Sequence, residues 1–219
     1  MDLEPLALSL RVSTVATALA VAAGVPLAWV LARKRFVGRD VVAVLVVLPM
    51  VLPPTVLGYT LLVALGRQGP VDPLIRALFG DGLVFTPVAA VLAAFVAATP
   101  FLVRAAQGGF EQVDATYEEA ARTLGRREVA IFFTVTAPLA WRGIVAGIAL
   151  CFARAIGEFG ATLMLAGNIP GRTQTGSVAI YDAVQAGRLD QATALALGLA
   201  LIAGLALFLI ARVGRGARW

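Results

Sequence analysis

The chain has 219 residues, of which 60% are hydrophobic and only 14% are charged, against about 25% charged residues in an ordinary soluble domain. This composition predicts an integral membrane protein. With no histidine and one cysteine, the chain lacks the means for an internal disulfide, haem ligation by histidine, the usual zinc sites and histidine acid–base chemistry. The net charge of +5 does not indicate nucleic-acid binding, because the arginines flank apolar runs instead of gathering on one soluble surface.

Five apolar segments are long enough to cross a bilayer, whose core of about 30 Å needs about 20 helical residues. In chain order they are 6–31, 41–65, 84–103, 143–166 and 192–210. The apolar run 131–139 is too short to cross and is expected to lie at the interface or to lead into the fourth span. We therefore expect an all-α, polytopic transmembrane helix bundle of about five spans, with six as the upper count, in a single domain over 1–219.

The second span carries Pro49, Pro53 and Pro54 near its middle. A proline inside a helix removes one backbone hydrogen bond and clashes with the preceding turn. The prolines predict that this span breaks or kinks between Leu48 and Pro54. Two interpretations stay open: a kink that serves packing, and a broken helix that lines a substrate pathway.

Basic residues orient the spans, because segments that stay in the cytoplasm carry an excess of arginine and lysine. With the N-terminus outside and the C-terminus cytoplasmic, the inner segments 32–40, 104–142 and 211–219 hold twelve basic residues. The outer connections then hold four, which are Arg67, Arg76, Arg172 and Arg188. The sequence favours this orientation.

The longest inner connection, 104–142, predicts a short helix from about Ala115 to Leu124. Asp114 is a good N-cap, and Gly125 suits the left-handed position after the last turn. Four residues share one helix face at spacings of three and four: Tyr117, Ala120, Ala121 and Leu124. Their small central side chains allow close approach of another protein, and the alternative is a helix lying on its own subunit. Glu118 and Arg122 are expected to pair along the helix flank.

The spacing in this connection resembles the coupling loop of ABC importer permeases, the binding-protein-dependent transport inner-membrane component family. Glu119-Ala120-Ala121 is followed after three residues by Gly125 and after nine more by Val135-Thr136-Ala137-Pro138. The family pattern is E-A-A, three residues, G, nine residues, I-x-L-P. Val135 and Ala137 depart from it, Ala137 at a packing position. The resemblance extends from the first span to the last.

This resemblance implies that a loop of about 110–138 docks on a separate ATPase subunit, which binds ATP and Mg²⁺. The chain itself is then a transport subunit and not an enzyme, with no cofactor, no metal site and no catalytic residue. The residues implied in ATPase coupling are Tyr117, Glu119, Ala120, Ala121, Leu124, Gly125 and Pro138.

The fourth span carries two charges, Arg154 and Glu158, four residues apart on one helix face. Each charge is costly in a bilayer, and together they neutralise one another. Gly157 and Gly160 flank this point and loosen the helix. The four residues form either a structural ion pair with its glycines or part of a gate or translocation path, and both interpretations stay open.

Turn-forming residues over 167–175 predict a loop on the outer side. The string Gly157-Glu158-Phe159-Gly160, followed by Gly167-Asn168-Ile169-Pro170-Gly171, resembles the molybdate branch of the permease family, and the sulfate branch shares the first part. The resemblance implies that this loop faces an extracytoplasmic binding protein through Asn168, Pro170, Gly171 and Thr173.

The expected function is the permease subunit of an ABC importer for an oxyanion, with molybdate ahead of sulfate, thiosulfate and tungstate. A stand-alone secondary transporter or channel is the alternative of another class, and it predicts an internal repeat or several intramembrane acids. The sequence has no evident repeat and one mid-span acid, Glu158. The resemblance further implies a homodimer surrounded by lipid in the bacterial cytoplasmic (inner) membrane, with no nucleic-acid partner.

Overall fold

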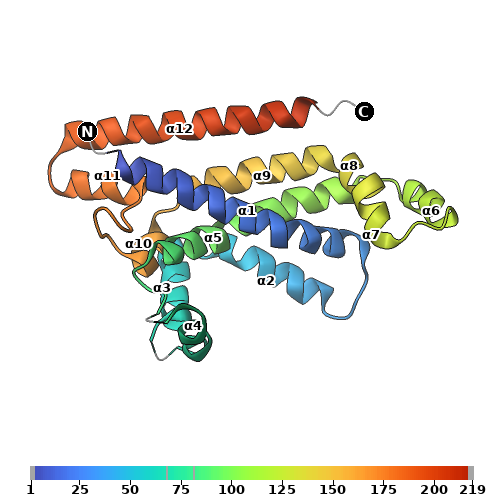
Figure 1. Ribbon diagram of the computed structural model, residues 1–219, viewed down its shortest axis with the longest axis horizontal. Coiled ribbons are helices and arrows are strands. Elements are labelled where there is room, and N and C mark those ends of the chain that lie inside the picture. The colour runs from blue at the N-terminus through green and yellow to red at the C-terminus, as the bar shows by residue number, and fades with distance from the viewer. Residues whose placement is uncertain (1–2, 68, 81, 217–219) are drawn as a thin grey trace.

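The computed structural model describes residues 3–67, 69–80 and 82–216, and every regular element within these ranges is helical. Three helices are long and apolar enough to cross a membrane, and the number rises to five if each of two bent helix pairs forms one span. The three long helices are α1 (Glu4–Arg33), α5 (Pro87–Glu111) and α12 (Leu189–Gly216). The expected all-α bundle of about five spans is confirmed (Figure 1).

Helix α5 forms the centre of the bundle and packs against both α1 and α9 (Trp141–Ile156). Its buried face is a ladder of alanines that includes Ala89, Ala93 and Ala97. Small side chains let helix backbones approach closely, which supplies van der Waals contact where lipid removes the hydrophobic drive for association. A Cβ on Gly143 of α9 would lie 2.6 Å from Gly109 Cα of α5, so this crossing admits only glycine.

The second span is broken, as the prolines predicted. Helix α2 (Arg39–Val51) ends before Pro53, and α3 (Pro54–Leu65) starts at an angle of 116° to it. Pro54 occupies the first position of α3. The N–H of a residue at this position has no partner within the helix, so proline loses no hydrogen bond there. The break is confirmed, and its role in a pathway stays a prediction.

The fourth span is not the single helix predicted over 143–166. Helix α9 ends at Ile156, residues 157–159 leave the helical path, and α10 (Gly160–Ala166) follows. Glu158 causes the restart, because its Oε1 accepts a hydrogen bond from the backbone N–H of Ala161 in the first turn of α10. Apolar composition alone does not show such a break.

The insert between α5 and α9 contains α6 (Ala115–Thr123), α7 (Glu128–Ile131), the π-helix η1 (Phe132–Thr136) and α8 (Ala137–Leu139). The segment Glu128–Leu139 meets α9 at 77°, so the short apolar run leads into the fourth span as expected. We call this end of the bundle the insert end (Figure 1, right).

Two short helices were not predicted. Helix α4 (Asp72–Phe79) follows α3, and α11 (Gly176–Gln185) precedes α12, against which it packs. Both are too short to cross a bilayer. Helix α11, α10 and the start of α1 lie at the end opposite the insert, which we call the loop end (Figure 1, left).

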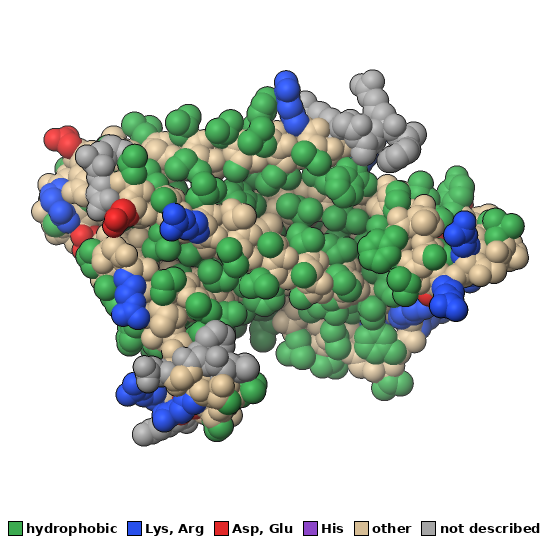
Figure 2. All heavy atoms as spheres, in the orientation of Figure 1, with side chains coloured by type: hydrophobic (Ala, Val, Ile, Leu, Met, Phe, Trp, Pro, Cys, Tyr) green, Lys and Arg blue, Asp and Glu red, His purple; other side chains and the backbone are tan. Residues whose placement is uncertain are grey.

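The surface has the distribution expected of a membrane protein. Figure 2 shows hydrophobic side chains over the middle of the face in view and charged side chains mainly toward the ends of the molecule. Exposed leucines along α12, among them Leu197, Leu201 and Leu205, belong to this apolar surface. Exposed apolar area of this extent is stable in lipid and unstable in water.

Candidate functional site

Helix α6 forms at the predicted place with the predicted caps. The Asp114 side chain accepts hydrogen bonds from the backbone N–H and the hydroxyl of Thr116, and these bonds hold the pKa of Asp114 below its ordinary value. Gly125 adopts φ of 75°, the left-handed conformation that ends a helix. Leu124 is the C-cap residue instead of the last helical one.

The predicted apolar face of α6 is divided between two environments. Tyr117 is 59% exposed and Leu124 is 81% exposed, and Ala120 is also exposed. Ala121 is instead buried, on the side where α6 contacts α7 and η1. The face open to a partner is therefore Tyr117, Ala120 and Leu124 with the exposed Glu119, and Ala121 is a packing residue of its own subunit. The alternative in which this helix lies on its own subunit holds for the Ala121 side, and docking of the exposed side on another protein stays a prediction.

Glu118 lies on the buried side of α6 and is only 5% exposed. Its Oε1 accepts hydrogen bonds from Arg33 Nε at 3.1 Å and from Thr136 Oγ1 at 2.8 Å. Arg122 Nη2 lies 3.5 Å from Oε2, so the predicted pair along the helix is present, but it is the longest of these contacts. Arg33 also donates to the carbonyl of Val113, just before α6.

Pro138 lies in α8, directly after the π-helix η1. A proline ring clashes with the carbonyl four residues back and removes one helical hydrogen bond, and a wider turn before it accommodates the clash. π-Helical turns are rare in proteins, and those that occur are often found at functional sites. Pro138 is half-buried, so the structure places it in the joint between the insert and α9 and not on the exposed face of α6.

At the loop end, Arg154 and Glu158 form the predicted ion pair. Arg154 Nη1 lies 2.5 Å from Glu158 Oε2, and the Glu158 side chain is 1% exposed against 28% for Arg154. With Oε1 bonded to Ala161 N, the carboxylate joins the end of α9 to the start of α10. The predicted ion pair is present, and both interpretations of its role, structural or in the pathway, stay predictions.

The two broken spans meet beside this pair. A Cβ on Gly160, the first residue of α10, would lie 2.7 Å from Pro54 Cβ, the first residue of α3. A Cβ on Gly58 would lie 2.8 Å from Ala161 Cα. The two half-helices thus pack backbone against backbone. Gly157 differs, since it is exposed and a Cβ there would meet only Ala153 O at 3.6 Å.

The loop 167–175 is present as predicted, but its residues do not all face outward. Asn168, Pro170 and Gly171 are exposed, whereas Thr173 is fully buried. The Thr173 hydroxyl accepts a hydrogen bond from Ile169 N and so holds the turn. The prediction of Thr173 as a surface contact is therefore wrong, because its side chain is used within the loop. Asn168 donates to Asp182 of α11.

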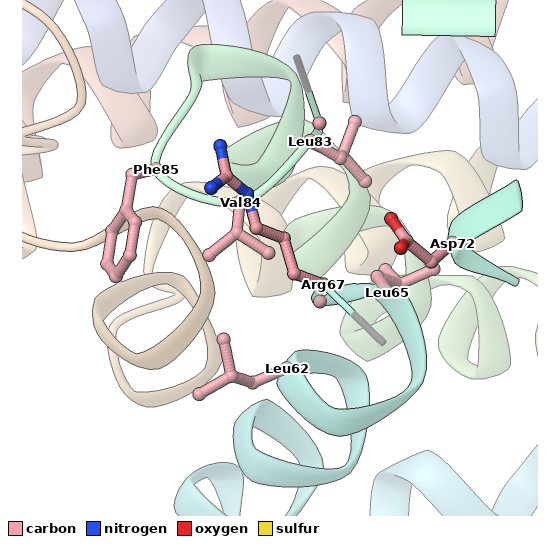
Figure 3. A pocket seen from close by; sticks show the side chains of 9 residues that line it. Leu62, Leu65, Arg67, Asp72, Leu83, Val84 and Phe85 are labelled. Carbon is pink, nitrogen blue, oxygen red and sulfur yellow. The ribbon is translucent and has the colours of Figure 1, made fainter. Parts of the chain in front are cut away.

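A pocket of about 500 Å³ lies between the end of α3, the start of α4 and the segment before α5. Arg67 and Asp72 are its charged lining residues, and Leu83, Val84 and Phe85 form its apolar side (Figure 3). Asp72 is held by Arg76, whose Nη2 lies 2.9 Å from Oδ2. Phe85 has φ of 62° and donates its N–H to the carbonyl of Leu165, which ties this segment to α10.

The network of Glu118 with Arg33 and Thr136 was absent from the predicted site, as was the close packing of α3 on α10. The sequence did show Glu118 as an acidic residue on an amphipathic helix, but it was assigned to the helix flank. The partner Arg33 lies 85 positions away, and helical spacing does not connect residues at that separation. Among the described residues, no cluster of acidic or cysteine side chains forms a metal site.

Comparison with known proteins gives consistent results. The family model of binding-protein-dependent transport system inner membrane components matches residues 24–215. The chain is 41% identical to the molybdenum transport system permease protein ModB of Haemophilus influenzae over 89% of this chain and 85% of that one. It is also 41% identical to ModB of Escherichia coli K12, over 95% and 93% of the two chains.

Solved structures share the fold at low sequence identity. An inward-facing conformation of the MetNI methionine ABC transporter gives a TM-score of 0.75 at 18% identity and covers 98% of this chain and 95% of the other. A bacterial ABC transporter that imports alginate gives a TM-score of 0.72 at 15% identity, with 98% and 80% covered.

Proposed function

Because the chain belongs to the family of binding-protein-dependent transport system inner membrane components, we propose that it is the membrane-spanning subunit of an ABC importer that carries molybdate into the cytoplasm. The observation that carries the substrate is 41% identity with molybdenum transport permeases over nearly the whole of both chains. The chain is a transport subunit and not an enzyme, and ATP hydrolysis belongs to a separate protein.

The exposed face of α6 supports the ATPase as partner. Tyr117 and Leu124 leave apolar surface open on a helix that is capped at both ends and fixed from behind. Tyr117 also lines a hollow of about 290 Å³ beside the crossing of α5 and α9, which offers room for a partner side chain. A rigid helix with an exposed apolar face suits a groove on another protein.

Two copies of the chain would complete the transporter. Five spans are few to enclose a pathway, so two copies related by a two-fold axis would enclose it between them. A binding protein would deliver the anion to the loop end, where Asn168, Pro170 and Gly171 are exposed. Alternation between outward-open and inward-open states of the dimer would move the anion across.

The direct test is reconstitution of the chain with its ATPase and binding protein in liposomes. ATP-dependent uptake of molybdate, competed weakly by an equal concentration of sulfate, is the expected result. Uptake without ATP, driven by an ion gradient, would assign the chain to the secondary transporters. Equal competition by sulfate would remove the choice of molybdate while keeping the class.

The orientation is tested separately with single cysteines at the two ends. Leu124 is 81% exposed at the insert end, and Leu189 is 63% exposed at the start of α12. An impermeant thiol reagent applied to right-side-out vesicles should label Leu189→Cys and spare Leu124→Cys. The native Cys151 is fully buried and gives a low background. The reverse pattern would overturn the orientation and the ATPase contact together.

A further inference from the structure

The insert end contains one acidic side chain that is buried against its own subunit and yet belongs to the helix that faces the ATPase. Glu118 is 5% exposed, and both of its bonded partners are also largely buried, with the Arg33 side chain 16% exposed and Thr136 1% exposed. Burying a charged group costs much free energy unless the group is paired and hydrogen-bonded. The bonds at 3.1 Å and 2.8 Å meet that condition.

The partners of Glu118 come from different parts of the fold. Arg33 is the last residue of α1, and Thr136 is the last residue of the π-helix that leads through α8 into α9. Arg33 Nη2 also donates to Val113 O at 2.6 Å, so the same guanidinium holds both the start and the inner face of α6. One carboxylate thus joins the exposed helix to the end of α1 and to the π-helix that leads into α9, and both α1 and α9 pack against α5.

We propose that Glu118 is a positioning residue for energy coupling, which fixes α6 to α1 and η1 so that movement of a docked ATPase reaches α1 and α9. The proposal rests on the proposed function. Charge-assisted hydrogen bonds keep their geometry under displacement better than apolar contacts do, because they are directional and strong. The outer face of α6 binds the partner, and its inner face passes the movement on.

The test compares two glutamates of the same insert. Glu118→Gln keeps the side-chain size and removes the charge. Glu128→Gln is the matched control, because Glu128 also bonds an arginine, Arg122 at 2.6 Å, but is 46% exposed. Each variant is assembled with the ATPase and binding protein in liposomes, and phosphate release and molybdate uptake are measured on the same vesicles.

In Glu118→Gln, we expect the molybdate taken up per ATP hydrolysed to fall about tenfold. A tenfold change corresponds to the free energy of about one charge-assisted hydrogen bond. ATPase recruitment should remain, and the ratio in Glu128→Gln should stay within about twofold of the wild type. A proportional fall of hydrolysis and uptake in Glu118→Gln would overturn the proposal, because a residue that only stabilises the fold lowers both together.

A double variant keeps the test decisive if Glu118→Gln fails to fold. Arg33→Met combined with Glu118→Met removes both charges and leaves none stranded, so the fold should survive. Its uptake per ATP should remain low. The proposal would be overturned if the double variant had normal stability and normal uptake per ATP hydrolysed, or if neither variant assembled. Glu118 would then have a role in folding alone. Wild-type vesicles without ATP-dependent uptake would instead contradict the proposed function itself.

Discussion

The two ends of the bundle each bury a glutamate against an arginine, but the two pairs connect different things. At the insert end, Glu118 meets Arg33 across 85 positions of sequence and joins separate helices. At the loop end, Glu158 meets Arg154 one helical turn back and joins α9 to α10. The local pair, Arg154 with Glu158, stabilises the interruption between two helices. The long-range pair, Arg33 with Glu118, fixes two helices that could otherwise move apart.

The largest expected effect distinguishes the members of the local pair. Arg154→Met strands a carboxylate that is 1% exposed, whereas Glu158→Gln keeps an oxygen for the Ala161 N–H and strands only an arginine that is 28% exposed and can reach solvent or lipid headgroups. Breaking a buried pair costs about 3–5 kcal/mol, so Arg154→Met should approach that loss and Glu158→Gln should cost less. Denaturation of the purified protein in detergent measures both.

The double variant Arg154→Met with Glu158→Gln is the internal control for this pair, because glutamine keeps the acceptor for the Ala161 N–H. It leaves no stranded charge and should be more stable than Arg154→Met alone. Additive losses would show that the two side chains act independently. Normal stability with lost molybdate uptake would move Arg154 into the pathway and end its purely structural interpretation.

A second expected effect concerns the glycines beside the local pair. Gly160→Ala places a Cβ 2.7 Å from Pro54, where the ring and backbone of α3 cannot move aside, and overpacking of this kind costs about 1–3 kcal/mol. Gly157→Ala is the matched change three residues earlier, and its Cβ meets nothing closer than 3.6 Å. Equal stability of the two variants would contradict the packing of α3 on α10.

The contrast between the ends also shows how far the sequence determines the fold and the site. Apolar length predicted the spans, Pro53 and Pro54 predicted the break after α2, and Asp114 and Gly125 predicted both caps of α6. These features depend on neighbours along the chain. The end of α9 at Ile156 was not predicted. The hydrogen bond between Ala161 N and Glu158 forms only when the chain leaves the helical path between them, so helical spacing does not indicate it.

The rest of the site depends on contacts between distant segments. The spacing of Tyr117, Ala120, Ala121 and Leu124 identified the apolar face of α6 and could not say which part of it η1 would cover. The pairing of Glu118 with Arg33 requires α1 to end beside α6. Thr173 was assigned to the surface because a loop of turn residues gives no indication of which side chain holds the turn.

A third prediction separates the two faces of α6. Leu124→Ser changes a side chain that is 81% exposed, so the free energy of unfolding should stay within about 0.5 kcal/mol of the wild type. ATPase binding should weaken by about tenfold, as expected for an apolar contact at an interface centre. Ala121→Asp, on the buried side, should destabilise the insert and weaken binding as a consequence. Co-purification with the ATPase and melting in detergent give the two readings.

The smallest expected effect belongs to Glu128, which bonds Arg122 at the surface of the insert and so serves as the exposed counterpart of Glu118. The hydrogen bond from Arg122 lowers the pKa of Glu128 from its ordinary value of 4.5. A carboxyl with a lowered pKa in the folded state stabilises the fold above its unfolded pKa and loses that contribution as the pH falls through its folded pKa. Water and salt screen a pair this exposed, so Glu128→Gln should cost little at neutral pH, and the wild type and the variant should converge as the pH falls through the lowered folded pKa of Glu128. Melting temperatures from pH 7 down to pH 3 measure the difference, and high salt should reduce it further. A large loss at neutral pH that persists in high salt would show that Glu128 is held as firmly as Glu118, and the distinction between buried and exposed pairs at this end would fail.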